Sequence, residues 1–306
     1  MFDRHVVSAL AALPSGCRPW SRGWCSALAG ILEAAAAKPG NVHPTESFPD
    51  LSFADLTAAA VATVDAMDRA RHRPLGQTIL AAVRASRAAT SSNANLGIIL
   101  LVAPLAAAEG PMTPAAVETA LERLGPADAT AVWEAIAVAR PGGLGESAAW
   151  DLAGPPPEDI REAMRHAAGR DSIARLWAEG YAPLFAGPVA DLAAAIGAGA
   201  ALEDAVIETH LRQLAREPDS LIARRHGLAA AEDVARRARV LIAGRRADEW
   251  PADLASFDGF LRRPRRLNPG TTADLVAAAI YILLRDGRLR AALPLPTPLP
   301  PDPDAA

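Results

Sequence analysis

The sequence contains few aromatic residues, few cysteines and no apolar run long enough to cross a membrane. Aromatic residues make up only 5% of the 306 residues, and the two cysteines are Cys17 and Cys25. A pair so close together forms no disulfide framework and fits no zinc spacing, although a single local disulfide stays open. The longest apolar run, residues 96–108, contains Pro104 and suits a buried core helix. We therefore expect reduced thiols and a cytoplasmic protein without a membrane span.

The sequence also lacks an excess of charge of either sign. Its 31 lysines and arginines stand against 35 aspartates and glutamates, which gives a formal net charge of -4 at pH 7. The basic residues are spread among the acidic ones, apart from a short group within residues 262–266. Such a distribution gives no electrostatic case for binding to nucleic acid or to a membrane surface. Near the start, Asp3 offsets Arg4 and no strongly basic segment precedes the apolar run, so a cleaved signal peptide is not expected.

Alanine and leucine dominate the hydrophobic residues, which make up 51% of the chain. These two residues lose least on entering a helix, whereas the β-branched and aromatic residues that favour strands are scarce. Apolar positions recur at three- and four-residue spacing, and no stretch alternates as a strand would. We therefore predict an all-α fold built as a single multi-helix, bundle-like domain. The expected helices cover residues 20–37, 53–70, 74–90, 91–110, a stretch from 113, 126–140, and about 158–178, 181–197, 201–216, 228–243 and 272–286.

This domain is predicted to span residues 1–290. The proline-rich tail at residues 291–306 is expected to be extended and disordered. The prolines at 155–157 could divide the chain into two domains, yet each half would then carry polar motifs cut off from those of the other. We therefore interpret the chain as one domain.

Four polar segments interrupt this helical background. The first is KPGNVHPTESFPD at residues 38–50, which follows a helix through a Pro-Gly turn. Its lysine could hold a phosphate as a point charge, and its aspartate could hold Mg²⁺. The second is SSNANLG at residues 91–97, whose amides and backbone N–H groups could seat an anion or a ribose. Taken alone, an ordinary helix stop explains the first segment better, and an N-cap explains the second better.

The third and fourth segments lie in the second half of the chain. EPDSLIARRHG at residues 217–227 offers Asp219 as a helix cap and Arg224 one turn later. RLNPGTTADL at residues 266–275 makes a turn, after which Thr271 or Thr272 caps a helix whose first turn holds Asp274. The helix dipole favours a carboxylate at that place, and a capped, solvated helix accounts for the third segment. No single segment establishes a site.

Taken in order along the chain, the four segments resemble the triphosphoribosyl-dephospho-CoA synthase family, in a divergent branch. The resemblance runs from about Trp24 to Gly287, and its most specific pieces are KPGNV at 38–42 and NPGTTADL at 268–275. The family is all-helical, in agreement with the apolar spacing. The resemblance implies a transferase with ATP and 3′-dephospho-CoA as substrates. Its members join the triphosphoribosyl group of ATP to a ribose 2′-hydroxyl and release adenine.

Such a reaction needs a cradle for a triphosphate with Mg²⁺ and an acceptor for the proton of the incoming hydroxyl. The resemblance implies Asp50, Asp219 and Asp274 as catalytic candidates, with Asp50 and Asp274 also as Mg²⁺ ligands. It implies nucleotide binding by Lys38, Gly40, Asn41, His43, Asn93, Asn95, Gly97, Arg224, Asn268, Gly270 and Thr271. Lys38 and Arg224 would hold phosphates, the asparagines would orient ribose or phosphate oxygens, and the glycines would let the backbone approach the nucleotide. His43 could be an acid, a base or a phosphate donor, or have no role.

The chain departs from the family pattern in its second polar segment. Enzymes of this reaction tend to read Asn-Thr-His-Lys-Gly where this chain reads NANLG at residues 93–97, and residues 138–151 hold no histidine either. Losing two cationic side chains should weaken triphosphate binding, by about 1–3 kcal/mol for each charged hydrogen bond.

This departure leaves two alternatives open. One is a related transferase with another acceptor, such as a precursor of a methanopterin- or methanofuran-type cofactor. The other is a non-catalytic, nucleotide-binding helical protein. The sequence also leaves open whether the chain forms a homodimer. Convergence of the four segments on one cleft would favour catalysis, whereas scattered segments would be caps and turns.

Overall fold

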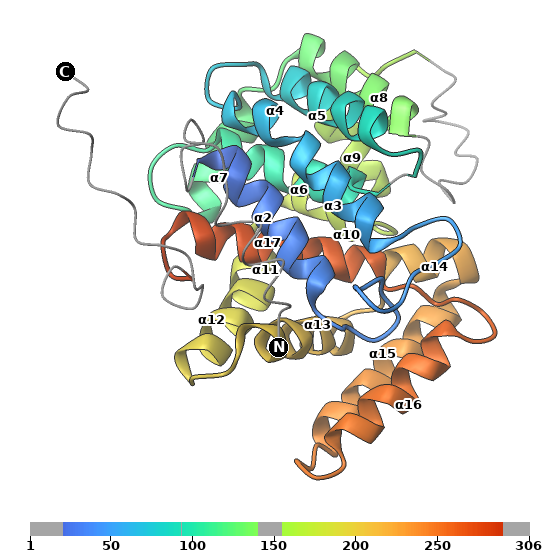
Figure 1. Ribbon diagram of the computed structural model, residues 1–306. Coiled ribbons are helices and arrows are strands. Elements are labelled where there is room, and N and C mark those ends of the chain that lie inside the picture. The colour runs from blue at the N-terminus through green and yellow to red at the C-terminus, as the bar shows by residue number, and fades with distance from the viewer. Residues whose placement is uncertain (1–20, 93, 140–154, 290–306) are drawn as a thin grey trace, which may run out of the picture.

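The computed structural model describes residues 21–92, 94–139 and 155–289. Within these ranges helices are the regular elements and there is no strand, which confirms the predicted all-α fold (Figure 1). Two isolated bridges, His43 with Glu46 and Phe48 with Leu51, fold the loop between the first two helices back on itself. No helix of the described part is long and apolar enough to cross a membrane. The proline-rich tail lies outside the described residues.

The helices follow one another along the chain, and a long loop over residues 36–52 separates the first two. The first six are α2 (Arg22–Ala35), α3 (Phe53–Ala62), α4 (Val64–Asp68), α5 (Leu75–Ala89), α6 (Leu96–Ala107) and α7 (Pro114–Glu122). Next come α8 (Pro126–Ala139), α9 (Ile160–Ala167), α10 (Ser172–Glu179), α11 (Ala182–Leu184), the π-helix η1 (Phe185–Val189) and α12 (Ala190–Gly197). The last five are α13 (Leu202–Arg216), α14 (Ser220–His226), α15 (Leu228–Ala243), α16 (Trp250–Arg262) and α17 (Gly270–Arg285).

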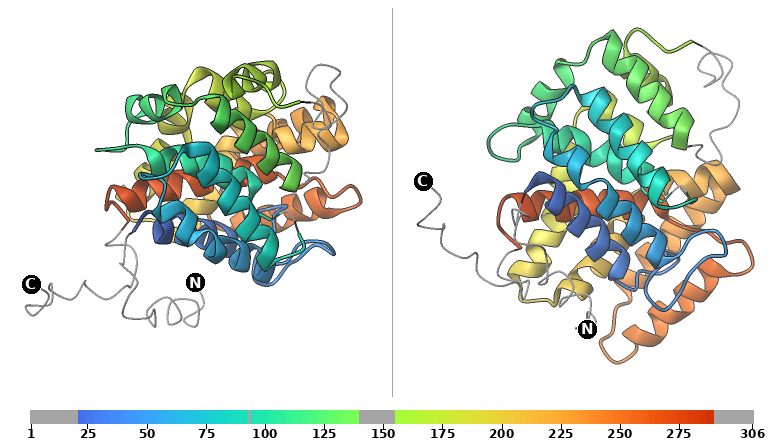
Figure 2. Two further views of the ribbon diagram at one scale, coloured as in Figure 1. Left: turned by 90° about the horizontal axis from the view of Figure 1, so that it is seen from above. Right: turned by 45° about the horizontal axis from the view of Figure 1, so that its top comes forward.

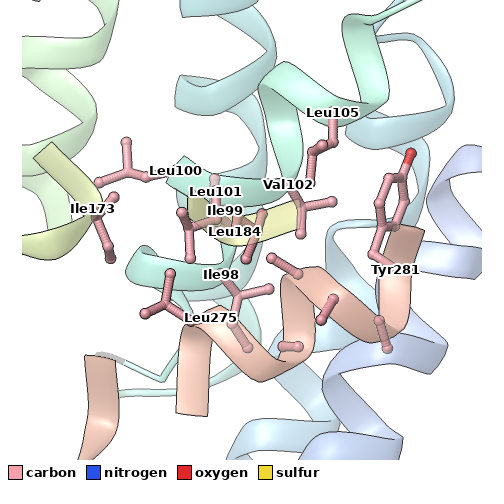
Figure 3. Packing of buried hydrophobic residues seen from close by; sticks show 14 of the residues in the cluster. Ile98, Ile99, Leu100, Leu101, Val102, Leu105, Ile173, Leu184, Leu275 and Tyr281 are labelled. Atoms are coloured by element: carbon pink, nitrogen blue, oxygen red, sulfur yellow. The ribbon is translucent and has the colours of Figure 1, made fainter. Parts of the chain in front are cut away.

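Helix α17 crosses the middle of the molecule and is buried along nearly its whole length (Figures 1 and 2). It packs on α2, α6 and α13, which come from both halves of the sequence. Figure 3 shows the contact with α6, where Ile98, Ile99 and Val102 lie against α17. A helix that is apolar on all sides is stable only when it is surrounded, so α6 and α17 form the centre of the core. Because one core cluster joins both halves, we propose a single domain.

Helix α6 contains a proline whose missing N–H is compensated from outside the helix. Pro104 cannot bond to the carbonyl of Leu100 four residues earlier. The indole Nε1 of Trp177 donates to that carbonyl at 3.0 Å, and the hydroxyl of Tyr181 donates to the next one, Leu101, at 3.2 Å. Both aromatic side chains are fully buried. The bonds fix α10 against α6, and these two helices form part of the site described below.

Trp177→Phe is expected to lower the free energy of unfolding by about 1–3 kcal/mol, because the carbonyl of Leu100 loses its best donor, with a further loss from the smaller ring. Urea denaturation followed by circular dichroism measures the change. Trp250→Phe is the matched control, since Trp250 is only partly buried at the start of α16. Equal unfolding midpoints for the two variants would contradict the role given to the indole.

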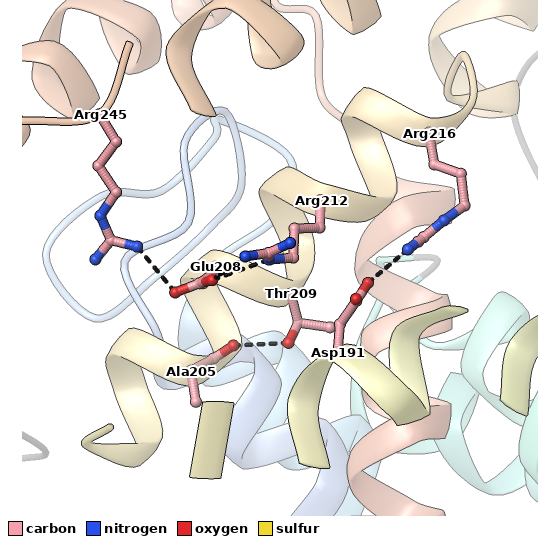
Figure 4. Close-up of polar contacts among 7 residues, drawn as sticks. All are labelled: Asp191, Ala205, Glu208, Thr209, Arg212, Arg216 and Arg245. Atoms are coloured by element: carbon pink, nitrogen blue, oxygen red, sulfur yellow. Dashed lines mark hydrogen bonds and ion pairs between the residues drawn. The ribbon is translucent and has the colours of Figure 1, made fainter. Parts of the chain in front are cut away.

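On the opposite side of the core, ion pairs hold the outer face of α13 (Figure 4). Glu208 binds Arg212 on its own helix at 2.9 Å and Arg245 from the segment after α15, also at 2.9 Å. Arg216 binds Asp191 of α12 at 2.7 Å. These side chains are partly exposed, so each pair adds about 0–1 kcal/mol at most. They orient α12 and α13 rather than stabilise the fold as a whole.

Most expected helices exist, with differences in detail. The helix expected over residues 91–110 begins only at Leu96, and the one expected over residues 181–197 contains the π-helix η1. The helix expected over residues 158–178 is two helices, because Asp171 caps a new start and accepts from the N–H groups of Ile173 and Ala174. The helix expected over residues 53–70 divides at Thr63. Helix α16 was not predicted, since it buries only Phe257 and Leu261 and so shows no broad apolar stripe.

Candidate active site

A cavity of about 500 Å³ lies where the loop after α2 meets α6, α8, α9, α10, α14 and α17. Its size suits a small molecule. In Figure 1, α8 and α9 lie on one side of α6 and α10, whereas α14 and the loop after α2 lie on the other. Parts of all four polar segments line it: Asn41 and Asp50 of the first, Gly97 of the second, Arg224 of the third, and Asn268, Gly270, Thr271 and Asp274 of the fourth.

The cavity has an apolar wall and a charged wall. The apolar wall comes from α6, α8, α9 and α10 and comprises Leu96, Ile98, Leu100, Trp133, Ile136, Ile160, Ala163, Met164, Ala167, Ile173 and Ala174. The charged side chains come mainly from the loops, from the last turn of α14 and from the N-terminal part of α17. Such a site fits a ligand with a flat apolar ring at one end and several charges at the other.

Four arginines reach the charged wall: Arg170, Arg224, Arg225 and Arg266. Arg224 pairs with Asp171, and Arg266 pairs with Asp50 and lies 4.1 Å from the centre of the Phe48 ring. Burial, together with repulsion from Arg266 and Arg224, lowers the pKa of Arg225. An anionic ligand would relieve this repulsion. Of these four arginines, only Arg224 was predicted as a site residue. The Arg-Arg pair at 224–225 could have indicated Arg225, and the basic group at 262–266 could have indicated Arg266.

Asp274 lines the cavity from just beyond the first turn of α17, not from within that turn as predicted. Among the described residues, none donates a hydrogen bond to its carboxylate or forms an ion pair with it. Burial, with the nearby charges of Glu33 and Asp219, raises its pKa well above the ordinary value. Gly97 makes room for it, since a Cβ at position 97 would stand 1.9 Å from Oδ2 of Asp274. A carboxylate left without a protein donor inside a cavity is suited to a ligand, a cation or a proton.

Asp219 lies behind the cavity wall, which corrects its predicted place among the ligand-facing carboxylates. It is 2% exposed and does not line the cavity. Its Oδ1 accepts from the N–H of Ile222 at 2.9 Å, and its Oδ2 accepts from the N–H and hydroxyl of Thr272 at 2.7 and 2.8 Å. Burial raises its pKa, against the effect of these bonds. Asp219 joins the starts of α14 and α17, and so positions Arg224 and Asp274.

Lys38 is also placed differently from its prediction as a phosphate ligand. It is fully buried and does not line the cavity. Its Nζ lies 2.9 Å from Oε1 of Glu33, donates to the backbone carbonyl of Glu33, and donates to that of Ala36 at 3.1 Å. An ammonium has three donors, so none is left for a phosphate. The cavity is lined instead by Glu33, which is not among the predicted site residues.

The rest of the first segment is a rigid turn. Gly40 has a φ of +77° and a Cβ there would meet Leu261 at 2.8 Å, so only glycine fits. Its N–H donates to Asp258 at 2.7 Å, while Arg262 donates to the carbonyl of Asn41 at 2.6 Å. The amide of Asn41 in turn donates to Asn268 at 2.8 Å. These contacts hold the first and fourth segments together at the cavity.

His43 stands outside the cavity lining, although it shares the loop. The hydroxyl of Thr45 lies 3.1 Å from its Nδ1, and burial together with the charge of Arg262 lowers the pKa of His43.

Asn95 is buried at the start of α6 and does not line the cavity. The oxygen of its amide is placed to accept from the N–H of Ala60 at 2.9 Å. Thr271 accepts from Ser220 at 3.0 Å. Asn93 lies outside the described residues.

Comparison with known proteins adds independent information. The sequence matches the family model described as ATP:dephospho-CoA triphosphoribosyl transferase over residues 19–292. The structure is similar to a crystal structure from Archaeoglobus fulgidus, provisionally described as a triphosphoribosyl-dephospho-CoA synthase, with a TM-score of 0.59 and 25% sequence identity. That alignment covers 75% of this chain and 98% of the other. A search of curated proteins found no match.

Proposed function

The chain belongs to the ATP:dephospho-CoA triphosphoribosyl transferase family and is a transferase, and we propose that its cavity moves the triphosphoribosyl group of ATP to the ribose 2′-hydroxyl of 3′-dephospho-CoA. Adenine is the leaving group. The observation that carries the proposal is the gathering of four arginines and an unpartnered aspartate opposite an apolar wall in one cavity. This chemistry and the size of the cavity fit a nucleoside triphosphate.

In this proposal the arginines hold the triphosphate and the apolar wall holds the adenine. Arginine presents several donors to phosphate oxygens in a fixed plane, and Trp133 offers a flat surface to a purine. The ribose then lies between the two walls. Breaking the bond from its anomeric carbon to adenine leaves positive charge on the ribose, which nearby carboxylates stabilise as they do in glycoside hydrolysis. Asp274 and Glu33 are the carboxylates available there.

Mg²⁺ is proposed as the cofactor that accompanies ATP. Mg²⁺ is usually held by one or two carboxylates together with substrate phosphates and water. Asp274 fits as a ligand because no described residue occupies its oxygens, and Asp50 fits through the oxygen that Arg266 leaves unused. No group of three or more metal-binding side chains gathers within the described ranges. When bound, the ion would neutralise phosphate charge.

A second candidate is the same transfer to another acceptor. Leu96 lines the cavity in a segment where related enzymes carry cationic residues, and the wall beside it is apolar. A less charged acceptor than 3′-dephospho-CoA, of the methanopterin or methanofuran-precursor kind, would suit that wall. A non-catalytic nucleotide-binding protein would share the arginines but would have no need of an unpartnered Asp274.

Incubation of the purified protein with ATP, Mg²⁺ and 3′-dephospho-CoA, followed by mass spectrometry, tests the proposal. We expect free adenine and the triphosphoribosyl adduct in equal amounts. Binding of ATP without adenine release would favour another acceptor, and release of adenine without adduct would indicate transfer to water. Absence of both binding and turnover would overturn the proposal.

Arg225→Gln is expected to raise the Kd for MgATP about tenfold or more, because a charged hydrogen bond to phosphate contributes about 1.5–3 kcal/mol. Isothermal titration calorimetry at fixed ionic strength measures it. Arg265→Gln is the matched control, since Arg265 is exposed and does not line the cavity. If both variants bind MgATP as the wild type does, the triphosphate does not lie on this wall.

A further inference from the structure

Glu33 is a cavity residue whose carboxylate is held from behind by a buried cation. It lies in the last turn of α2, is 5% exposed, and lines the cavity. The chain then turns through Pro39 and Gly40, and Lys38 folds back so that its Nζ stands 2.9 Å from Oε1 of Glu33. One carboxylate oxygen therefore has a fixed partner in the protein interior. The other is left for whatever occupies the cavity.

Within the described ranges, no second carboxylate forms an ion pair with Lys38. Its remaining donors go to the carbonyls of Glu33 and Ala36. His210 of α13 is fully buried nearby, and burial together with the charge of Lys38 holds its pKa well below the ordinary value. The imidazole is therefore neutral and does not compete with Lys38 for the carboxylate. Among the described residues, Glu33 is the carboxylate that the ammonium pairs with.

We propose, on the basis of the proposed transfer reaction, that Glu33 is a catalytic residue that accepts the proton of the attacking hydroxyl, and that Lys38 is the positioning residue that holds it. The geometry points to this assignment because Glu33 combines a free oxygen at the cavity with a fixed one behind it. Asp274 is the other unoccupied carboxylate of this part of the cavity, but it has no cation behind it. Asp50 is tied to Arg266 at the charged wall.

The step balances without any further reactant. The hydroxyl oxygen forms a bond to the anomeric carbon while the bond from that carbon to adenine breaks, and the bonding pair leaves with adenine. The hydroxyl proton passes to Glu33, and adenine takes up a proton from solvent. Glu33 returns its proton to solvent when the products leave. Burial raises the pKa of Glu33 and the charge of Lys38 opposes that rise, so the carboxylate is more basic than an exposed one yet can still ionise.

A double-mutant cycle on the full-length protein tests the inference. Glu33→Gln keeps the shape of the side chain and removes its basicity, so kcat for adduct formation should fall about 10²–10⁴-fold with the KM for ATP changed by less than about threefold. Lys38→Met should lower kcat when Glu33 is present and have no further effect once Glu33→Gln has been made, because a positioning residue acts only through its partner. Lys38→Met alone leaves a buried carboxylate without its cation, so the double variant, which is neutral, supplies the folded protein for the comparison. Glu118→Gln is the control. Like Glu33, Glu118 forms an ion pair, in its case with an arginine, but it does not line the cavity.

Calorimetric titration of the same proteins with MgATP separates this inference from the proposed function. The inference is supported if the double variant and Glu33→Gln have Kd values for MgATP within about threefold of each other. If the double variant binds MgATP about tenfold more weakly, Lys38 is a phosphate ligand and the inference is overturned. Normal kcat for Glu33→Gln would overturn it while the proposed function stands. If the wild type forms no adduct, the proposed function fails and the catalytic role of Glu33 falls with it.

Discussion

Asp274→Asn is expected to reduce adduct formation by about 10²–10³-fold and, at the same time, to make the metal-free protein more stable. The loss of activity follows from removing the negative charge that we propose to face the ribose and Mg²⁺. The gain in stability has a separate cause. Asp274 is half-buried at the cavity, its pKa is raised by burial together with the charges of Glu33 and Asp219, and no described residue donates to it. Replacing it with a neutral side chain of the same shape removes that repulsion.

The pH dependence of this gain has a definite sign. Because the pKa of Asp274 is raised in the folded protein, its ionisation opposes folding. The stability difference between Asp274→Asn and the wild type should be near zero below the ordinary carboxyl pKa of about 3.9. It should grow as the pH rises from there to the folded pKa and stay constant above it. Thermal unfolding without Mg²⁺ at pH 5 and pH 8 measures this.

Asp204→Asn is the matched control for that measurement. Asp204 lies near the start of a helix, α13, as Asp274 does in α17, but it is exposed and does not line the cavity. Its substitution should leave kcat unchanged and should not stabilise the protein at either pH. Equal activity of Asp274→Asn and the wild type would remove Asp274 from the mechanism. A destabilised Asp274→Asn would instead show that its carboxylate is satisfied in the folded protein.

The sequence was sufficient for the fold because helix-forming residues, apolar spacing and turn residues agree with one another along most of the chain. It was insufficient where tertiary contacts decide. Lys38 reads as a free cation beside a turn, and nothing in the sequence shows that its side chain reaches back into the core to Glu33. Arg170 was missed because it lies between α9 and α10, where one continuous helix was expected. Asp219 was placed in the site by the family pattern, whereas its bonds to Thr272 keep it behind the wall.

Two glycines shape the site because they allow other parts of the protein to pack closely against them. The expectation that Gly97 and Gly270 allow a close approach concerned the nucleotide, but both are in close contact with the protein itself. A Cβ at position 270 would meet Leu221 at 2.6 Å, and one at position 97 would meet Asp274. Gly97 of the second polar segment therefore packs directly against Asp274 of the fourth. The sequence shows that both residues are present, but it does not show that they are in contact.

Gly97→Ala is expected to lower kcat for adduct formation by about 10²-fold or more, because a misplacement of about 1 Å at a reacting centre has effects of that size. A methyl group at position 97 would stand 1.9 Å from Oδ2 of Asp274, closer than any contact allows, so the carboxylate must turn away. Steady-state kinetics with ATP and 3′-dephospho-CoA measures the loss. Gly259→Ala is the matched control, because it also replaces a glycine with alanine within a helix, α16. A Cβ at position 259 would meet nothing within 4 Å. That control should keep full activity and gain about 0.5–1 kcal/mol of stability.

The double variant Gly97→Ala with Asp274→Ala shows whether the clash is the cause. Shortening Asp274 removes the atoms that the new methyl group would meet, so the double variant should regain the thermal stability that Gly97→Ala loses while staying inactive. Recovery of stability without activity would mean that Gly97 serves to seat the Asp274 carboxylate. If Gly97→Ala alone kept full activity, the carboxylate could work in more than one orientation, and its close seating against α6 would have no part in the transfer.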